Sequence, residues 1–414
     1  MATNEELKTL LVIGNGFDLA HGLKTRYTDF LDCVKELQNS LNERQEELVE
    51  RLAENHVRSM KKDLPPVHYL NPDKYKKIET EKNRFKETYK QKLKQLHENE
   101  NYLKKCREKI QSSLKSGKFL KPRLIRYTHF FGNIWLSYFN KIQNEKLRLI
   151  GENWVDFENE MTSIIQKFEK YILNLENMKD EERKKIDRDM SHFVSSRIDY
   201  NPKILFQKDI PRMDWDLKIL TLLLEQYLIE EEKNLKADTK EFFKTLNPEA
   251  VISYNYSHSF QKLYTDKKIY VHFIHGELGK HNLVLGIGET LSDDKKDVLT
   301  VCASFKKFFQ IIKYKLGNQY KKITQSDNQN IVWQVIIYGH SLDSTDKDSL
   351  KWLMQKWTGK KNVVDVNRPI KKISIYYYNE NSYNQQIANA IQIIGKDELI
   401  NAVNSGRIVF SPIQ

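Results

Sequence analysis

Cysteine is scarce in this chain of 414 residues: there are three, far apart, at Cys33, Cys106 and Cys302. Their spacing matches neither a zinc site nor a disulfide framework, so we predict no metal and expect free thiols. Free thiols are typical of a reducing compartment. The first ten residues also lack the basic and apolar regions of a signal peptide. We therefore expect a cytoplasmic, soluble protein.

Long apolar runs, proline and glycine are scarce as well. No apolar stretch approaches the roughly 20 residues that a membrane-spanning helix needs, so we expect no membrane partner. Only 9 prolines and 15 glycines are present, which excludes collagen-like and low-complexity classes. Hydrophobic residues make up 39% and charged residues 30%, which indicates a globular chain with an unusually polar surface. Its length allows two or three units with separate cores.

Positive charge exceeds negative charge, with 68 Lys+Arg against 56 Asp+Glu and a net charge of +12. Such an excess permits binding to nucleic acid, although a solvated helical surface produces it more often. The densest basic and aromatic segment is Lys115–Arg123, with Arg126 and Tyr127 close behind it. If nucleic acid binds to this chain, we expect it there.

Six short runs rich in β-branched and apolar residues are predicted to be buried strands. They lie at residues 10–14, 250–255, 269–275, 283–288, 332–339 and 372–378. Helical patterns follow the last two, at 344–357 and 384–394. Alternating strands and helices, with near-continuous apolar strands, predict an α/β fold with a Rossmann-like, mostly parallel sheet.

A large helical insertion is predicted between the first two strands. Residues 36–126 are rich in Lys, Glu and Gln, which indicates long charged helices, and residues 127–247 show amphipathic helical patterns. We therefore expect two domains. Residues 1–35 and 248–414 would form the Rossmann-like nucleotide-binding domain, and residues 36–247 the insertion.

The first predicted strand ends in Gly14-Asn15-Gly16. A strand that ends in Gly-x-Gly can turn sharply and bring backbone N–H groups to a pyrophosphate. The third glycine of the usual dinucleotide pattern is displaced to Gly22, so a plain tight turn explains the motif equally well. Asp18 is unsuited to direct phosphate contact, and we expect it to bond a ribose or backbone amides.

Polar residues also follow the second and third predicted strands. Asn255 can orient a ribose or a water molecule, or it can cap the next helix. His275 can act as a general base, and Gly276 beside it allows close backbone approach. A histidine that only satisfies a loop is as frequent as a catalyst. His272, earlier on the same strand, is expected to be structural.

Gly339, His340 and Ser341 follow a later strand and precede a helix, an arrangement suited to a phosphate or a ribose. The segment lacks the second glycine of a nucleophile elbow, so no acyl-transfer triad is implied. Asp156 and Glu158 do not form a paired-carboxylate metal site, and we expect them to cap or salt-bridge a helix.

Together these motifs resemble those of the AbiH-type phage abortive-infection family. Its landmarks occur here at residues 13–30, 154–158, 255–256, 274–276 and 339–342. The resemblance spans nearly the whole chain and implies a role in defence against bacteriophages.

The same ordered set is more distantly similar to the sirtuin-like NAD-binding domains of NAD-hydrolysing anti-phage proteins. In that pattern His275 matches the catalytic histidine. The chain departs from it at Asp18, where the pattern has a serine, and at Ser257, where it has an aspartate. Lys24 and His340 are further departures. The zinc-binding cysteine module of true sirtuins is absent from the sequence, so we do not expect protein deacylation.

The resemblance implies that the chain binds NAD or a related nucleotide and hydrolyses its N-glycosidic bond. Gly14 to Gly16 would hold the pyrophosphate, Asn255 would orient the ribose or the water, and His275 would act as the base. Asp18 and His340 would contact the ribose or the base. The alternative is a non-catalytic nucleotide sensor whose basic helices bind nucleic acid or a phage-derived trigger. A homo-oligomer is compatible with both.

Overall fold

The structure is a computed structural model. It describes residues 6–36, 79–88, 133–150, 156–173, 190–193, 209–236, 238–264, 269–288, 300–317, 320–323, 331–355 and 370–413, a few positions between 39 and 112, and residue 181. Contacts divide the chain into two compact units, one formed by Met1–Phe30 with Lys141–Gln414 and the other by Leu31–Asn140.

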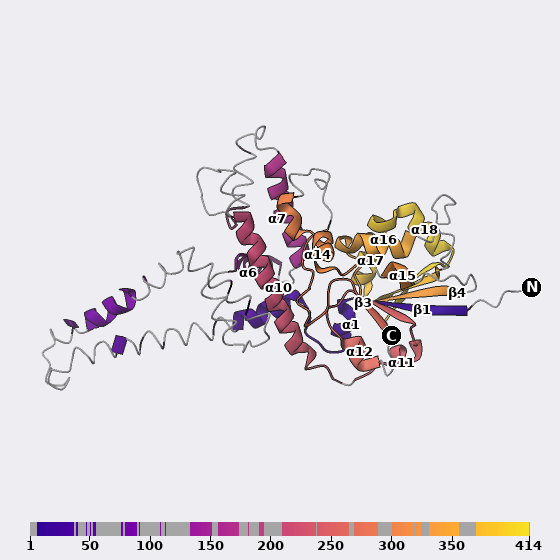
Figure 1. The fold of residues 1–414 in the computed structure, drawn as a ribbon, viewed down its shortest axis with the longest axis horizontal. Helices are drawn as coiled ribbons and strands as arrows, with labels where there is room; N and C mark the ends of the chain where they lie inside the picture. Colours follow the sequence, from indigo (N-terminus) through magenta and orange to yellow (C-terminus); the bar gives the residue numbers. More distant parts are fainter. Residues whose placement is uncertain are drawn as a thin grey trace, which may run out of the picture. The chain divides into compact units, whose positions relative to one another are not determined.

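A six-stranded sheet is the centre of the first unit (Figure 1). Its strands are β1 (Glu6–Ile13), β2 (Ala250–Ser253), β3 (Tyr270–Phe273), β4 (Ile331–Tyr338), β5 (Ile370–Tyr377) and β6 (Ile408–Pro412). Every neighbouring pair is parallel, and the order is β3-β2-β1-β4-β5-β6. This is the strand order of the doubly wound dinucleotide-binding fold, and it confirms the predicted Rossmann-like α/β class. The order reverses direction between β1 and β4.

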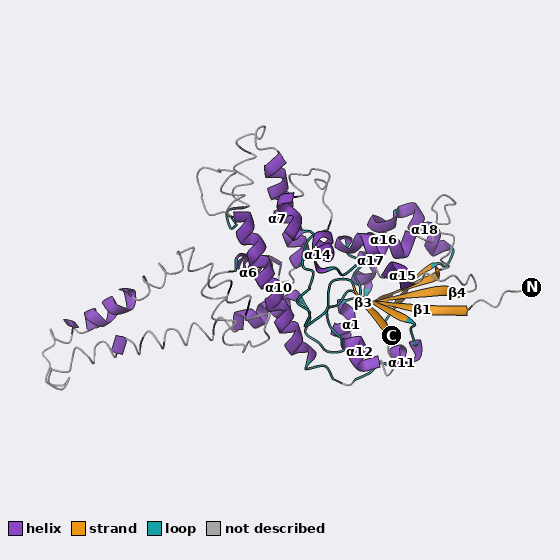
Figure 2. Ribbon diagram, viewed as in Figure 1, coloured by secondary structure: helices purple, strands orange, loops and turns teal. Residues whose placement is uncertain are grey.

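Helices cover both faces of this sheet (Figure 2). Against one face pack α15 (Tyr320–Ile323), α16 (Lys347–Gln355), α17 (Glu380–Ile394) and α18 (Lys396–Asn404); against the other pack α1 (Asn15–Ala20), α11 (Glu241–Leu246) and α12 (Ser259–Tyr264). Along β1, Leu10 and Val12 join the first core, while Leu11 and Ile13 join the second. Successive side chains of a strand point to opposite faces, so the apolar run at 10–13 is buried on both.

One predicted strand is wrong. Residues 283–288 form a buried loop with a single bridge, between Ile287 and Lys306. The side chain of Gln310 replaces a strand partner there, since it accepts from the N–H of Leu285 (3.0 Å) and donates to its carbonyl (2.9 Å). The apolar character of residues 283–288 therefore reflects burial and not pairing with a neighbouring strand. The edge strand β6 was not predicted.

Further helices among the described residues are α6 (Ile134–Ile150), α7 (Phe157–Leu173), α10 (Ile210–Glu232) and α14 (Lys307–Tyr314), with the short 3₁₀ turns η3 (Ala303–Phe305) and η4 (Ser344–Asp346). The whole of α7 and α10 falls in the same compact unit as the sheet, although we assigned both to the insertion. The predicted domain boundaries themselves stay a prediction. Among the described residues, no helix combines the length and apolar character needed to cross a membrane.

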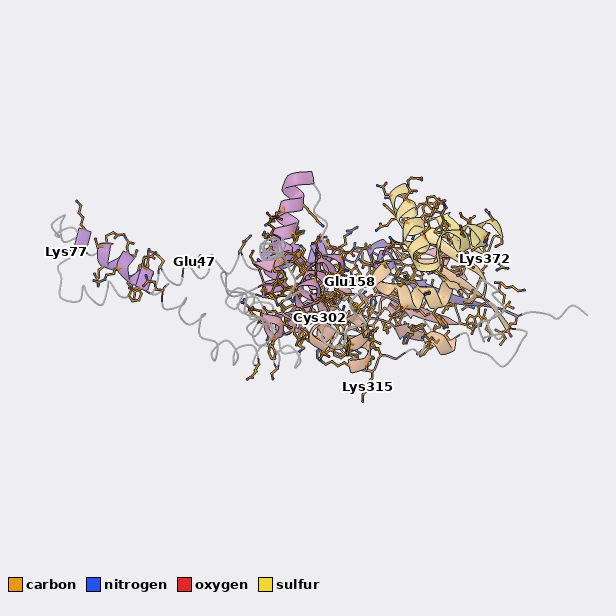
Figure 3. The ribbon with its side chains drawn as sticks, turned by 90° about the horizontal axis from the view of Figure 1, so that it is seen from above. Glu47, Lys77, Glu158, Cys302, Lys315 and Lys372 are labelled. Carbon is orange, nitrogen blue, oxygen red and sulfur yellow. The ribbon has the colours of Figure 1, made fainter. Side chains whose placement is uncertain are left out.

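The second unit is described only in part, and the charged residues Glu47 and Lys77 that Figure 3 labels belong to it. Glu50 forms ion pairs with Lys82 and Lys86, so two charged helical segments distant in sequence lie beside each other within this unit. The basic segment at 115–127 lies outside the described residues. Its binding to nucleic acid therefore stays a prediction.

A fully buried ion pair joins α7 to the start of α14. The Lys306 side chain is 0% exposed, and its Nζ lies 2.6 Å from Oε1 of Glu169. Removing one partner of such a pair leaves the other charge in a poorly polarisable interior, at a cost of about 3–5 kcal/mol.

We expect Lys306→Met to lower the free energy of unfolding by about this amount, as measured by urea denaturation followed by circular dichroism. The exposed Lys313, on the same α14, provides the control, because Lys313→Met should change stability by less than about 0.5 kcal/mol. The double variant Lys306→Met/Glu169→Leu should recover most of the loss. If Lys306→Met unfolds like the wild type, the pair does not stabilise this unit.

Candidate functional site

A cavity of about 430 Å³ lies at the carboxyl ends of β1 and β4, where the strand order reverses. Ligands of open α/β sheets bind in this crevice. Nine of the ten residues predicted for the site line it: Gly14, Asn15, Gly16, Asp18, Asn255, His275, Gly339, His340 and Ser341. The remaining lining residues are Thr25, Tyr27, Asp156, Glu158, Leu224, Leu228, Tyr254, Tyr256, Ser257, Asp343, Asp346 and Gln385.

Gly276, the tenth, does not line the cavity. Its φ of +91° favours glycine, and a Cβ there would lie 2.2 Å from the carbonyl oxygen of Asn282. The tight turn after β3 therefore explains this glycine without a ligand.

The glycines after β1 and β4 pack against each other. The N–H of Gly16 donates to the carbonyl of Gly339 (2.8 Å), and that of Gly14 donates to Tyr338 (3.0 Å). A Cβ on Gly16 would lie 2.6 Å from the Cα of Gly339. Both N–H groups therefore already donate within the chain, and the contact of residues 14–16 with a pyrophosphate stays a prediction.

Asp18 is a buried carboxylate, 2% exposed, that accepts hydrogen bonds from two serines. Ser257 Oγ donates to it at 2.6 Å, and Ser259 Oγ donates to its other oxygen. Burial raises the pKa of Asp18 to about 6, although both hydroxyl groups favour the ionised form. In the described part of the chain the partners of Asp18 are these two serines, and the contact that we expected with a ribose stays a prediction.

Asn255 lies close to this carboxylate, lines the cavity and is 5% exposed. Its amide is close enough to Asp18 to favour the ionised carboxylate, but not in the geometry of a hydrogen bond. Among the described residues, Nδ2 of Asn255 has no hydrogen-bond partner. The residue therefore retains an unpaired donor in the interior.

Asp346 holds His275. Nε2 of His275 lies 2.8 Å from Oδ1 of Asp346, and Lys307 Nζ lies 2.9 Å from the same oxygen. Burial alone would raise the pKa of Asp346, but the charge of Lys307 and the hydrogen bond from His275 hold it well below its ordinary value. The carboxylate is therefore ionised and can only accept, so Nε2 carries the proton of His275. The structure gives a hydrogen bond for Nε2 and none for Nδ1 among the described residues.

His340 is oriented by a different hydrogen bond. The N–H of Leu342 donates to Nδ1 of His340 at 2.8 Å, so the proton of this ring is on Nε2, which lies 3.5 Å from Oδ2 of Asp346. Its ring packs edge-on against Tyr254, with 4.1 Å between the centroids.

Asp156 and Glu158 act as we expected from the sequence. Asp156 caps α7, since its Oδ1 accepts from the N–H groups of Glu158 (2.9 Å) and Asn159 (3.1 Å). Glu158, labelled in Figure 3, forms an ion pair with Lys307 at 2.7 Å and accepts from Thr345 at 2.9 Å. Burial, followed by the charge of Glu158, raises the pKa of Asp156 to about 6.

Sequence reasoning missed Asp346 and Lys307. Asp346 lies in a segment that we interpreted only as the start of a helix. It follows His340 by six residues, and this closeness to a predicted site residue could have identified it. Lys307 lies in an apolar stretch beside phenylalanines and carries no local signal. Only the packing of α14 against α7 and η4 gives it two carboxylate partners.

A protein-family model described as "Bacteriophage abortive infection AbiH" matches residues 10–367. No curated protein and no solved structure matches the chain. The family expected from the sequence motifs is thereby confirmed, and the similarity to sirtuin-like domains stays a prediction.

The buried Asp18 makes stability depend on pH. Because its pKa in the folded chain is higher than the ordinary 3.8, its contribution to stability is present below about pH 4 and is lost as the pH rises through about 6. Asp18→Asn stays neutral throughout, so between pH 4 and pH 7.5 the stability difference should move in its favour by about 3 kcal/mol. Urea denaturation across this pH range measures it.

Asp397→Asn, on the exposed first turn of α18, is the control for this experiment, since its stability should follow the wild type at every pH. Parallel curves for Asp18→Asn and the wild type would contradict the assigned state of Asp18.

Proposed function

The chain belongs to the AbiH family, and we propose that it hydrolyses the N-glycosidic bond of NAD or a related nucleotide in the cavity between β1 and β4. Membership of this family suggests a role in bacteriophage abortive infection. Destroying a nucleotide that the whole metabolism needs would halt an infected cell, so the proposed reaction fits that role.

The observation that carries the proposal is the pair formed by His275 and Asp346 at the edge of the cavity. An ionised carboxylate on Nε2 leaves Nδ1 as the basic atom and stabilises the positive charge that the ring gains when it takes a proton. The pair lies at the sheet's switch point, where nucleotides bind in folds of this strand order.

The chemistry of the bond suits the remaining lining residues. Cleavage of a glycosidic bond passes through a transition state with oxocarbenium character at the sugar, which carboxylates stabilise. Water would add to the anomeric carbon of the ribose while its proton passes to Nδ1 of His275. Nicotinamide would leave as a neutral molecule with the electron pair of the broken C–N bond. Asn255 would orient the ribose or the water.

Two departures from the sirtuin-like pattern also support the proposal. The pattern has a serine where this chain has Asp18 and an aspartate where it has Ser257. Here the exchanged residues bond each other at 2.6 Å. A carboxylate and a hydroxyl group are therefore both kept in this corner of the site, although their positions in the sequence are exchanged.

We expect His275→Ala and Asp346→Asn each to lower the rate of NAD hydrolysis by roughly 10²–10⁴-fold, because the first removes the base and the second its orientation. Nicotinamide release by purified protein, and the NAD content of phage-infected cells that express each variant, measure the effect. His272→Leu is the matched control. His272 lies on β3, and burial lowers its pKa to about 4, so it is neutral. Its Nε2 has no hydrogen-bond partner among the described residues, so activity should persist.

Destruction of NAD by His275→Ala at the wild-type rate would overturn the mechanism. If the wild type binds NAD and releases it intact even in infected cells, the alternative of a non-catalytic nucleotide sensor applies instead.

A further inference from the structure

The charges that line the cavity are strongly one-sided. Five carboxylates line it, from Asp18, Asp156, Glu158, Asp343 and Asp346, and among the residues that the structure describes no lysine or arginine does. Lys307 is not one of the lining residues. It forms ion pairs with Glu158 and Asp346, so two carboxylates share one positive charge. The lining groups that can gain a positive charge are His275 and His340, and Nδ1 of His340 already accepts a hydrogen bond from the N–H of Leu342.

These carboxylates repel one another. After burial, the largest cause of the raised pKa of Asp156 is the charge of Glu158, and Asp343 adds to it. Asp343 is itself held by a hydrogen bond from the N–H of Thr345 (2.8 Å) at the start of η4. The cavity thus has a negative potential that the described residues do not neutralise, and a positive ligand would relieve it.

A phosphate group would find little support in the same space. The N–H groups of Gly14 and Gly16 donate within the chain, and α1 is only six residues long. Each negative charge on the phosphate would face the carboxylates of Asp343 and Asp346 across a poorly polarisable wall. The inner cavity therefore disfavours the part of a dinucleotide that we first assigned to the glycine turn.

Two buried polar groups indicate that a ligand belongs here. Asn255 and His275 are 5% and 6% exposed, both line the cavity, and Nδ2 of the first has no partner among the described residues. Nδ1 of the second has none there either. A metal ion does not fit, since no three potential ligands in the described part of the chain are placed to hold one.

We infer that the cavity binds the positively charged end of its substrate, an N-ribosylated pyridinium, and leaves the phosphate groups outside, with Asp156 and Asp343 as the residues that select for charge. The inference rests on the proposed function, which it deepens by naming the part of the substrate that the cavity recognises. It follows that the oxidised form of the ligand binds and the neutral reduced form does not bind equally well.

Equilibrium dialysis with the wild-type chain tests the inference directly. The probes are nicotinamide riboside, its uncharged reduced form and inorganic pyrophosphate, and chromatography of the retained ligand separates intact from cleaved molecules. We expect the cation to bind at least about tenfold more tightly than the reduced form, and pyrophosphate not to compete with it. Equal affinity for both ribosides, or displacement of the cation by pyrophosphate, would overturn the inference.

Two variants each remove one carboxylate charge from the cavity and keep the fold. Asparagine caps helices about as well as aspartate, so Asp156→Asn and Asp343→Asn keep the caps of α7 and η4. Each should reduce the preference for the cation several-fold, and the double variant should reduce it further. Asp397→Asn, at the start of α18 and outside the cavity, should keep the wild-type preference. A preference unchanged in the double variant would count against these two residues.

The outcomes separate the inference from the function it rests on. Selective binding of the cation without any hydrolysis would leave the inference standing and contradict the proposed reaction. Hydrolysis of NAD without selectivity between the two ribosides would support the proposed reaction and contradict the inference.

Discussion

The buried ammonium group of Lys307 is the contact on which the geometry of the site depends. It lies within 3 Å of carboxylates from two elements far apart in the sequence, Glu158 at the start of α7 and Asp346 at the end of η4. Without this charge the two carboxylates would repel each other across a dry interior, where interactions between charges are strong. With it, Asp346 stays ionised, and an ionised Asp346 fixes the proton of His275 on Nε2. The role proposed for His275 thus depends on a lysine that does not line the cavity.

The position of the cavity follows from the strand order of the sheet, and the negative charge of its lining follows from the loops. Parallel strands bring four chain segments to one edge, and the reversal of order between β1 and β4 opens a crevice there. Gly16 and Gly339 let the two flanking turns approach closely, but this packing uses their backbone donors. The carboxylates after β4 and before α7 then give the crevice a negative potential. The same fold that commonly binds a pyrophosphate here has a crevice lined by carboxylates.

The sequence predicted the fold class, and nine of the residues that it proposed for the site line one cavity, because both results depend on patterns local to each strand. Apolar runs that end in Gly14, Asn255, His275 and Gly339 are enough to place four polar ends at one edge of a parallel sheet. The partners of those residues were not predictable. Asp18 finds Ser257 and Ser259 across more than two hundred residues, and Lys307 finds Glu158 across about 150. Such pairs form only when distant segments pack together, and no local sequence pattern predicts that packing. The strand predicted at 283–288 failed for the same reason, since burial and strand pairing produce the same apolar run.

The central claim is that the glycosidic bond of the nucleotide lies against His275 in the cavity between β1 and β4. A crystal structure of the His275→Ala variant with NAD tests it most directly, because this variant keeps the ligand uncleaved. The account predicts the nicotinamide and its ribose inside the cavity, beside Asn255 and the position of the missing imidazole, with both phosphate groups outside it. Phosphate groups against Asp343 and Asp346, or NAD bound at another edge of the sheet, would contradict it.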